Sequence, residues 1–216
     1  MNAIVVFIDQ IDTAVPGTLA PITAQLLTLA RNAGEPVAAV AGPVGAGLAA
    51  ALGSYGVTRV LHSEQPELGD YLVAPKADLV AQAAAAVHGA AVLVDNGAQG
   101  KEIAARVGVA LNAGVITDAV GLENDGGTPV ALKSVLAGSY TVAARATTPV
   151  SVISVKSHSV EPSVAPAPAT PSVEALAVAF GPASLGARIV NREARLASGR
   201  PELEDARIVV AGGPRG

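Results

Sequence analysis

The 216-residue sequence has no cysteine, no tryptophan and only five other aromatic rings, two of phenylalanine and three of tyrosine. The missing thiols exclude disulfides, thiolate catalysis and cysteine-ligated zinc or iron–sulfur centres. Five scattered rings do not make the stacking platform on which single-stranded nucleic acids bind. The net charge is −4, and the basic residues near the carboxyl end are interleaved with acidic ones, so there is no basic footprint for nucleic acid.

The sequence also lacks a long hydrophobic run. No segment approaches the about 20 apolar residues that a membrane-spanning helix needs. The apolar amino-terminal segment is short, has no basic start and runs into Asp9, which is typical of a first strand and not of a signal peptide. We therefore expect no membrane insertion and a cytoplasmic location.

What the chain has is alanine, valine, leucine and isoleucine in alternating blocks, and apolar residues make up 50% of it. Short apolar runs alternate with stretches of helical spacing, the rhythm of strands joined by crossover helices. This predicts an α/β fold with an open, mostly parallel three-layer sheet and helices on both faces. The predicted strands are 3–8, 37–41, 59–62, 90–94 and 115–120, and the predicted helices are 19–33, 46–55, 74–87 and 100–111.

The pattern changes after Thr128. Residues 129–138 and 140–153 look like strands without helices between them, and residues 157–172 contain four prolines, typical of an extended, flexible connector. A short helix at 187–196 and a last strand at 208–211 are expected beyond it. We therefore divide the chain into an α/β domain (1–156), the connector (157–172), the remainder of that domain (173–200) and the start of a second domain (201–216), represented by its orphan first strand.

The last ten residues carry the most suggestive chemistry. A short apolar strand runs into Gly212 and Gly213, which let the backbone turn sharply beside a bulky group such as a phosphate or a flavin. Arg215 would then hold a positive charge at the carboxyl end of that strand, where open α/β sheets bind ligands. These three residues are the candidate cofactor-binding residues.

Two other glycine-rich turns follow predicted strands. Residues 42–47 read Gly-x-x-Gly-x-Gly, the reverse of a dinucleotide-binding fingerprint, and Pro43 removes a backbone donor, so a structural turn is favoured over a phosphate site. Residues 95–102 are not a Walker loop, and Asp95 or Asn96 is expected to cap the next helix. His62, His88 and His158 are far apart in the sequence, and no residues assemble a metal site or a catalytic triad.

Four segments in order resemble one family. Gln99–Val107, Ile116–Val120, Leu136–Thr141 and Arg200–Gly213 are similar to the electron transfer flavoprotein alpha subunit, and the last of these is quite specific. The resemblance covers essentially the whole chain. It implies a Rossmann-like first domain that packs on a beta subunit, and a second domain that holds FAD.

The resemblance also implies a role: the flavin passes electrons from acyl-CoA dehydrogenases towards a membrane quinone reductase, as in fatty acid β-oxidation, so the subunit is an electron carrier and not an enzyme by itself. Of the family's flavin contacts only Arg215, with Gly212 and Gly213, has a counterpart here. Pro214 interrupts the turn, and the family's later flavin-binding segments have no counterpart, so we expect a truncated FAD domain that does not retain FAD.

Two other classes of function stay open at this point. Gly42–Gly47 motivates a stand-alone module that binds AMP or ATP in the crevice of the first sheet. A hydrolase of the same fold class has no nucleophile or base in its favour.

Overall fold

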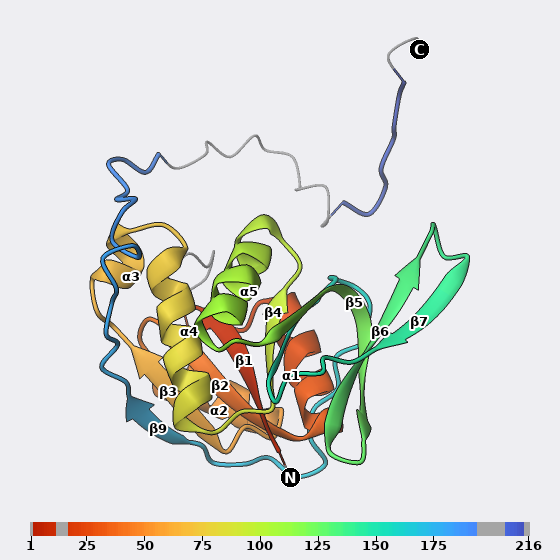
Figure 1. Ribbon diagram of the computed structural model, residues 1–216, viewed down its shortest axis with the longest axis horizontal. Helices are drawn as coiled ribbons and strands as arrows, with labels where there is room; N and C mark the ends of the chain where they lie inside the picture. The colour runs from red at the N-terminus through yellow and green to blue at the C-terminus, as the bar shows by residue number, and fades with distance from the viewer. Residues whose placement is uncertain (1, 12–16, 194–205, 214–216) are drawn as a thin grey trace.

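The computed structural model describes residues 2–11, 17–193 and 206–213, and its centre is one nine-stranded sheet (Figure 1). The strand order is β7-β6-β5-β8-β4-β1-β2-β3-β9. The strands are β1 (Ala3–Asp9), β2 (Glu35–Ala41), β3 (Arg59–Ser63), β4 (Ala91–Asp95), β5 (Gly114–Asp125), β6 (Thr128–Val135), β7 (Tyr140–Ala144), β8 (Ser151–Val155) and β9 (Ser172–Ala175). The helices are α1 (Pro21–Ala33), α2 (Ala46–Ser54), α3 (Glu67–Asp70), α4 (Ala74–Ala86) and α5 (Ala98–Ala110).

All strand pairs are parallel except β5 with β6 and β6 with β7. The expected mostly parallel α/β sheet is therefore confirmed. The expected strand 140–153 is two strands: β7 is antiparallel to β6, and β8 is parallel to β4 and β5. β8 lies between β4 and β5, so the hairpins extend one side of the sheet. In Figure 1 the β6–β7 hairpin projects away from the body of the molecule.

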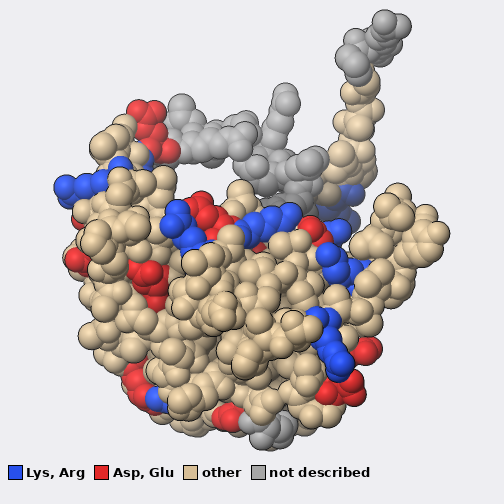
Figure 2. Space-filling model, viewed as in Figure 1, with Lys and Arg blue, Asp and Glu red and all other residues tan. Residues whose placement is uncertain are grey.

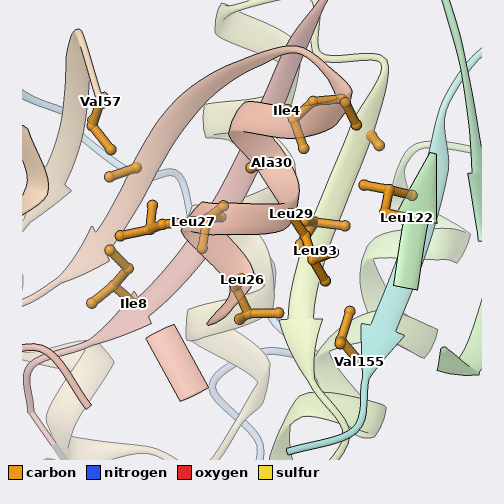
Figure 3. Packing of buried hydrophobic residues seen from close by; sticks show 14 of the residues in the cluster. Ile4, Ile8, Leu26, Leu27, Leu29, Ala30, Val57, Leu93, Leu122 and Val155 are labelled. Carbon is orange, nitrogen blue, oxygen red and sulfur yellow. The ribbon is translucent and has the colours of Figure 1, made fainter. Parts of the chain in front are cut away.

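Each strand side chain points to one of two helical layers because successive residues of a strand face opposite ways. Ile4 and Ile8 of β1 face the layer of α1 and α2, whose buried residues include Leu26, Leu27 and Leu52 (Figure 3). Val5 faces the other layer, formed by α4 and α5. Burial on both faces explains why the central strands are continuous apolar runs.

The connector after β8 corrects one expectation. Residues 157–171 are extended, but they are bound across the α1–α2 layer and not a flexible link. Ser163 exchanges hydrogen bonds with Thr28, and Arg31 of α1 donates to both the carbonyl and the hydroxyl oxygens of Ser163. The backbone amide of Ala169 donates to the carbonyl of Gly53 in α2. We call residues 157–171 the strap.

The strap leads to an element that the sequence analysis missed. β9 pairs in parallel with β3, and the Arg59 guanidinium binds the Glu174 carboxylate through two hydrogen bonds of 2.9 and 2.8 Å. The next residues lie on α4, where Val178 is buried and the Gln82 side chain both accepts from and donates to the backbone of Ala179.

Two predicted elements of the carboxyl-terminal part are wrong. Residues 187–193 of the expected helix 187–196 are not helical, and the rest of it lies outside the described residues. The expected strand 208–211 is not a strand but an exposed, irregular segment in which Ile208 is 83% and Val210 92% exposed. A strand needs a neighbour for its backbone groups, and this segment has none among the described residues.

Candidate functional site

Among the described residues, charged and polar side chains gather where two neighbouring parallel strands end. β1 ends at Asp9 and β4 at Asp95, and the chain order reverses between these strands because β1 also pairs with β2. Ligands of open α/β sheets bind outside the carboxyl ends of strands at such a switch point. A crevice of about 180 Å³ opens there, which we call the switch-point crevice. Its lining residues are Phe7, Asp9, Ala20, Ile22, Thr23, Leu26, Asp95, Gln99, Gly100 and Ile103.

A buried ion pair forms one side of the crevice. Lys76 of α4 is 1% exposed, and its ammonium group lies 2.6 Å from Oδ2 of Asp9. Gln99 of α5 donates a longer hydrogen bond of 3.4 Å to the same oxygen. Because an unpaired buried ammonium is costly, Asp9 holds Lys76 in place and ties α4 to the end of β1.

Asp95 lies on the other side, against the first turn of α5. Its Oδ2 accepts a hydrogen bond of 3.3 Å from the Gly97 amide. The N-cap of α5 is Gly97 and no side chain bonds the first turn there, so the expectation that Asp95 or Asn96 caps this helix is wrong. A methyl group at Gly100 would lie 2.2 Å from the Asp95 carbonyl oxygen, so only glycine allows this close approach. Burial raises the pKa of the Asp95 carboxyl, and the negative charge of Asp9 adds to that rise.

Asn96 belongs to a second cluster, between the ends of β4 and β8 and an irregular step inside β5. Its side chain donates to Asp118 and accepts from the Asp118 amide and the Ser154 hydroxyl. Hydrogen bonds from Asn96, Thr117 and Lys101 hold the pKa of Asp118 at about 2. Asp118 has φ 60° at an irregular step of β5, and such left-handed residues persist only where their surroundings fix them.

The first glycine turn has a structural explanation. Gly42 has φ +113°, which an L side chain rarely adopts, and a methyl group added there would lie 3.1 Å from Cβ of Gln10. Gly45 is the N-cap of α2, and neither Gly45 nor Gly47 has an atom within 4 Å of an added methyl group. The geometry of Gly42 accounts for the turn without a phosphate.

The predicted cofactor-binding residues lie elsewhere. Gly212 and Gly213 are exposed, with nothing within 4 Å of an added methyl group, so the described residues form no cradle for a flavin around them. Arg215 lies outside the described residues. A contact of these three residues with FAD therefore stays a prediction, and no step of a mechanism can be derived through the flavin here.

The histidines do not meet, and the described part of the chain contains no group of three or more histidine, cysteine or acidic residues that could hold a metal ion. Basic and acidic side chains lie side by side on the face shown in Figure 2, and this face has no large basic patch. None of the described helices has the length and apolar character needed to cross a membrane.

Comparison with known proteins now decides the family. The model of the electron transfer flavoprotein domain matches residues 9–180, which include both carboxylates of the switch-point crevice, the strap and β9. The chain belongs to the electron transfer flavoprotein family. The resemblance carried by the four sequence segments is thereby confirmed.

Curated relatives in this family are alpha subunits. The chain is 33% identical to the electron transfer flavoprotein subunit alpha of Mycobacterium leprae over 200 residues, 91% of this chain and 61% of the relative. It is 36% identical to the subunit alpha of Mycobacterium tuberculosis over 147 residues, 67% of this chain and 45% of the relative. The chain thus spans less than two thirds of the length of these electron transfer flavoprotein subunits.

The sequence analysis identified the family but missed most of the crevice. It considered Asp95 only as a helix cap and gave no role to Asp9, Lys76 or Gln99. A signal was available, since Asp9 and Asp95 each directly follow an apolar strand. Their proximity depends on β1 and β4 being neighbours, which no local pattern shows.

Proposed function

We propose that this chain is the amino-terminal α/β region of an electron transfer flavoprotein alpha-type subunit, a scaffold that binds a beta subunit in an electron-carrying heterodimer. The observation that carries the proposal is the family match over residues 9–180 together with the two alpha-subunit relatives. In this role the assembled protein passes electrons from acyl-CoA dehydrogenase-type donors towards a quinone reductase of the respiratory chain, in the cytoplasm.

The chain itself is then a carrier subunit and not an enzyme. FAD is the cofactor of the assembly, and we propose that this chain alone holds it poorly. Gly212 and Gly213 stand open, and a flavin pocket would require walls that the described residues do not supply around them.

An exposed apolar surface supports binding of a partner. On the β6–β7 hairpin, Leu136 is 73%, Tyr140 60% and Val142 41% exposed. Patches of exposed apolar side chains often mark the sites where a partner protein binds. β7 pairs only with β6 among the described strands, so its other edge can also accept a strand.

The alternative of a stand-alone AMP or ATP module loses support from the crevice. Asp9 and Asp95 both line it, and Lys76, which lies beside Asp9, is paired with that carboxylate. A phosphate group would meet negative charge there.

Coexpression with the cognate beta subunit tests the proposal. We expect a one-to-one complex in size-exclusion chromatography with light scattering, and visible absorbance well below one flavin per complex. Replacing Leu136 and Tyr140 by Asp buries charge in the proposed contact and should weaken the complex about tenfold or more. Val190→Asp, at a residue that is 97% exposed, is the matched control and should leave the complex intact.

Two outcomes would contradict this proposal separately. A chain that stays monomeric beside a folded beta subunit overturns the scaffold role. A stoichiometric yellow flavin band overturns only the weak retention of FAD.

A further inference from the structure

Another cavity lies at the amino ends of the parallel strands, on the opposite edge of the sheet from the switch-point crevice. Its volume is about 470 Å³, within the range of sites that bind small molecules. We call it the amino-edge cavity. Its lining residues are Asn2, Ala90, Gly127, Thr128, Pro129, Arg145, Ala146, Thr147, Thr148, Pro149 and Ser151. The proposed function assigns no role to this cavity.

The hydroxyl group of Ser151, at the start of β8, has no hydrogen-bond partner among the described residues. Ser151 is 4% exposed, and its Oγ is fully buried. Buried hydroxyls are nearly always satisfied, by the protein or by a bound molecule. Ser154 of the same strand donates its hydroxyl to Asn96, and Thr148 of the same cavity both accepts and donates. Ser151 is the exception in these surroundings, and a ligand in the cavity would satisfy it.

The alternation of β8 decides which way Ser151 points. Val152 packs with α4 and α5 and Ile153 packs with α1 and α2, so Ser151 faces the α1 side of the sheet. The end of the β5–β6 hairpin lies on the same side, because Asn124 donates a hydrogen bond to the Ala33 carbonyl at the end of α1. The turn of this hairpin forms one wall of the amino-edge cavity. The serine side chain and that wall therefore share one face of the sheet.

Arg145 is the one charged side chain among the described residues that line the cavity. Its side chain is 64% exposed, and its Nη1 lies 4.0 Å from Oδ2 of Asp125, beyond the distance of a hydrogen bond. An exposed ion pair of this kind contributes little to stability, so a ligand can replace Asp125 as the partner of the guanidinium. The cavity thus combines a positive charge near solvent with a buried hydroxyl donor.

Charge and geometry select the class of ligand. A single guanidinium balances one negative charge, and its planar fork matches the two oxygens of a carboxylate. A phosphate monoester carries up to two negative charges at neutral pH and would leave one of them unbalanced near Asp125. The remaining walls include the apolar residues Ala90, Pro129, Ala146 and Pro149, which suit a compact apolar body.

We propose that the amino-edge cavity binds a free small monocarboxylate. Arg145 holds the carboxylate group, the Ser151 hydroxyl donates a hydrogen bond to the ligand, and the alanine and proline side chains contact its apolar body. The ligand satisfies the buried hydroxyl and gives Arg145 a closer partner than Asp125.

The probe is sodium benzoate, titrated into the full chain by calorimetry and by ligand-observed NMR. For a ligand of about nine heavy atoms we expect a dissociation constant on the order of 1 mM. Benzamide has the same shape without the charge and should bind at least about tenfold more weakly, because it loses the ion pair with Arg145. Benzylammonium reverses the charge and should not bind. Phenyl phosphate tests the other class of anion and should bind more weakly than benzoate.

Two pairs of variants locate the site. Arg145→Gln should weaken benzoate binding about tenfold or more. Arg188→Gln is its matched control and should bind like the parent, because Arg188 is 67% exposed and forms a similarly loose ion pair, with Asp70 at 3.6 Å.

The second pair separates binding from stability within β8. Ser151→Ala should weaken benzoate about tenfold, the expected effect of losing a hydrogen bond to a charged group, and should not lower the melting temperature of the ligand-free chain. Ser154→Ala should do the opposite, because it removes the hydrogen bond to Asn96 and leaves the cavity intact.

The proposal is overturned if benzoate gives no heat and no NMR effect with the folded parent chain. It is equally overturned if phenyl phosphate binds more tightly than benzoate, or if Arg145→Gln and Ser151→Ala, shown to be folded by circular dichroism, bind benzoate like the parent. None of these outcomes depends on a beta subunit or on FAD, so failure here is distinct from failure of the proposed function.

Discussion

From β1 to α5 the chain buries nearly every strand between two helical layers. From the strap onward it lies on the outside of that body, where β9 pairs with the edge strand β3 and the other segments are held by backbone hydrogen bonds and by side chains that reach their backbone. In the first region the polar backbone is satisfied by strand pairing, as in β1 with β2. In the second, Gln65 binds both the amide and the carbonyl of Val178, and Gln82 does the same for Ala179.

This contrast shows two ways in which segments of the chain are held in their positions. The first relies on apolar periodicity, which is local and repeated, so that no single contact decides the position of an element. The second relies on a few specific partners, such as Thr28 and Arg31 for Ser163. We therefore expect the second region to be sensitive to single substitutions on the surface that it covers.

The largest effect is expected where the strap meets α2. A methyl group at Gly53 would lie 2.1 Å from the carbonyl oxygen of Ala169, which cannot retreat without lifting the strap. Gly53→Ala should cost about 2 kcal/mol in the free energy of unfolding, the usual cost of overpacking, measured by urea denaturation. Hydrogen exchange should rise at the amides of Ala165 and Ala169, which donate to α2 carbonyls.

Gly47→Ala is the control in the same helix. No atom lies within 4 Å of its added methyl group, so this substitution should gain up to about 0.5 kcal/mol from helix propensity. If Gly53→Ala were as stable as Gly47→Ala, the strap would be loosely held, as the sequence analysis expected.

The same contrast explains what could be predicted from sequence. The elements between Ala3 and Leu111, apart from the short helix α3, could be predicted, because their apolar runs and helical spacing reflect burial on two faces. The strap and β9 could not, since a proline-rich segment has the same composition whether it is free or bound to Thr28 and Gly53. The predicted strand 208–211 failed for the opposite reason: its residues favour a strand, but no neighbour among the described residues pairs with it.

The candidate site likewise has a part that could be predicted from the sequence and a part that could not. The helix that follows β4 could be predicted from residues 95–102, but its N-cap is Gly97 and not Asp95 or Asn96. The proximity of Asp9 and Asp95 and the burial of Lys76 arise because α4, α5 and the two strands β1 and β4 meet in space. Only the order of strands in the sheet brings them together.

A smaller effect is expected at the cluster that joins the two sides of the sheet. Hydrogen bonds to its carboxylate, of which the one from Asn96 has the largest effect, lower the pKa of Asp118 from 3.8 to about 2 in the folded state. Because the pKa is lower in the folded state, the ionised carboxylate stabilises the fold above pH 3.8, and that stabilisation is lost as the pH falls towards 2. Because the side chain is 39% exposed, solvent screening reduces the effect to about 1 kcal/mol.

Asp118→Asn should therefore be about 1 kcal/mol less stable than the parent at pH 6, with the difference shrinking between pH 4 and pH 2. Asparagine also tolerates the positive φ of this residue, so the backbone is not the cause. Denaturation curves across this pH range measure the difference. A gap that persists unchanged at pH 2 would show that packing, and not the charge, explains the loss.

The smallest effect is expected from the segment at 206–213. Ile208 and Val210 are almost fully exposed and Gly212 and Gly213 touch nothing within 4 Å of an added methyl group, so this segment adds little to the buried core. Deleting residues 202–216 should leave the melting temperature unchanged and improve solubility, because an unpaired apolar segment invites association. A fall in melting temperature of several degrees would show that these residues do pack on the sheet in solution, and it would move the boundary between the two regions of the molecule.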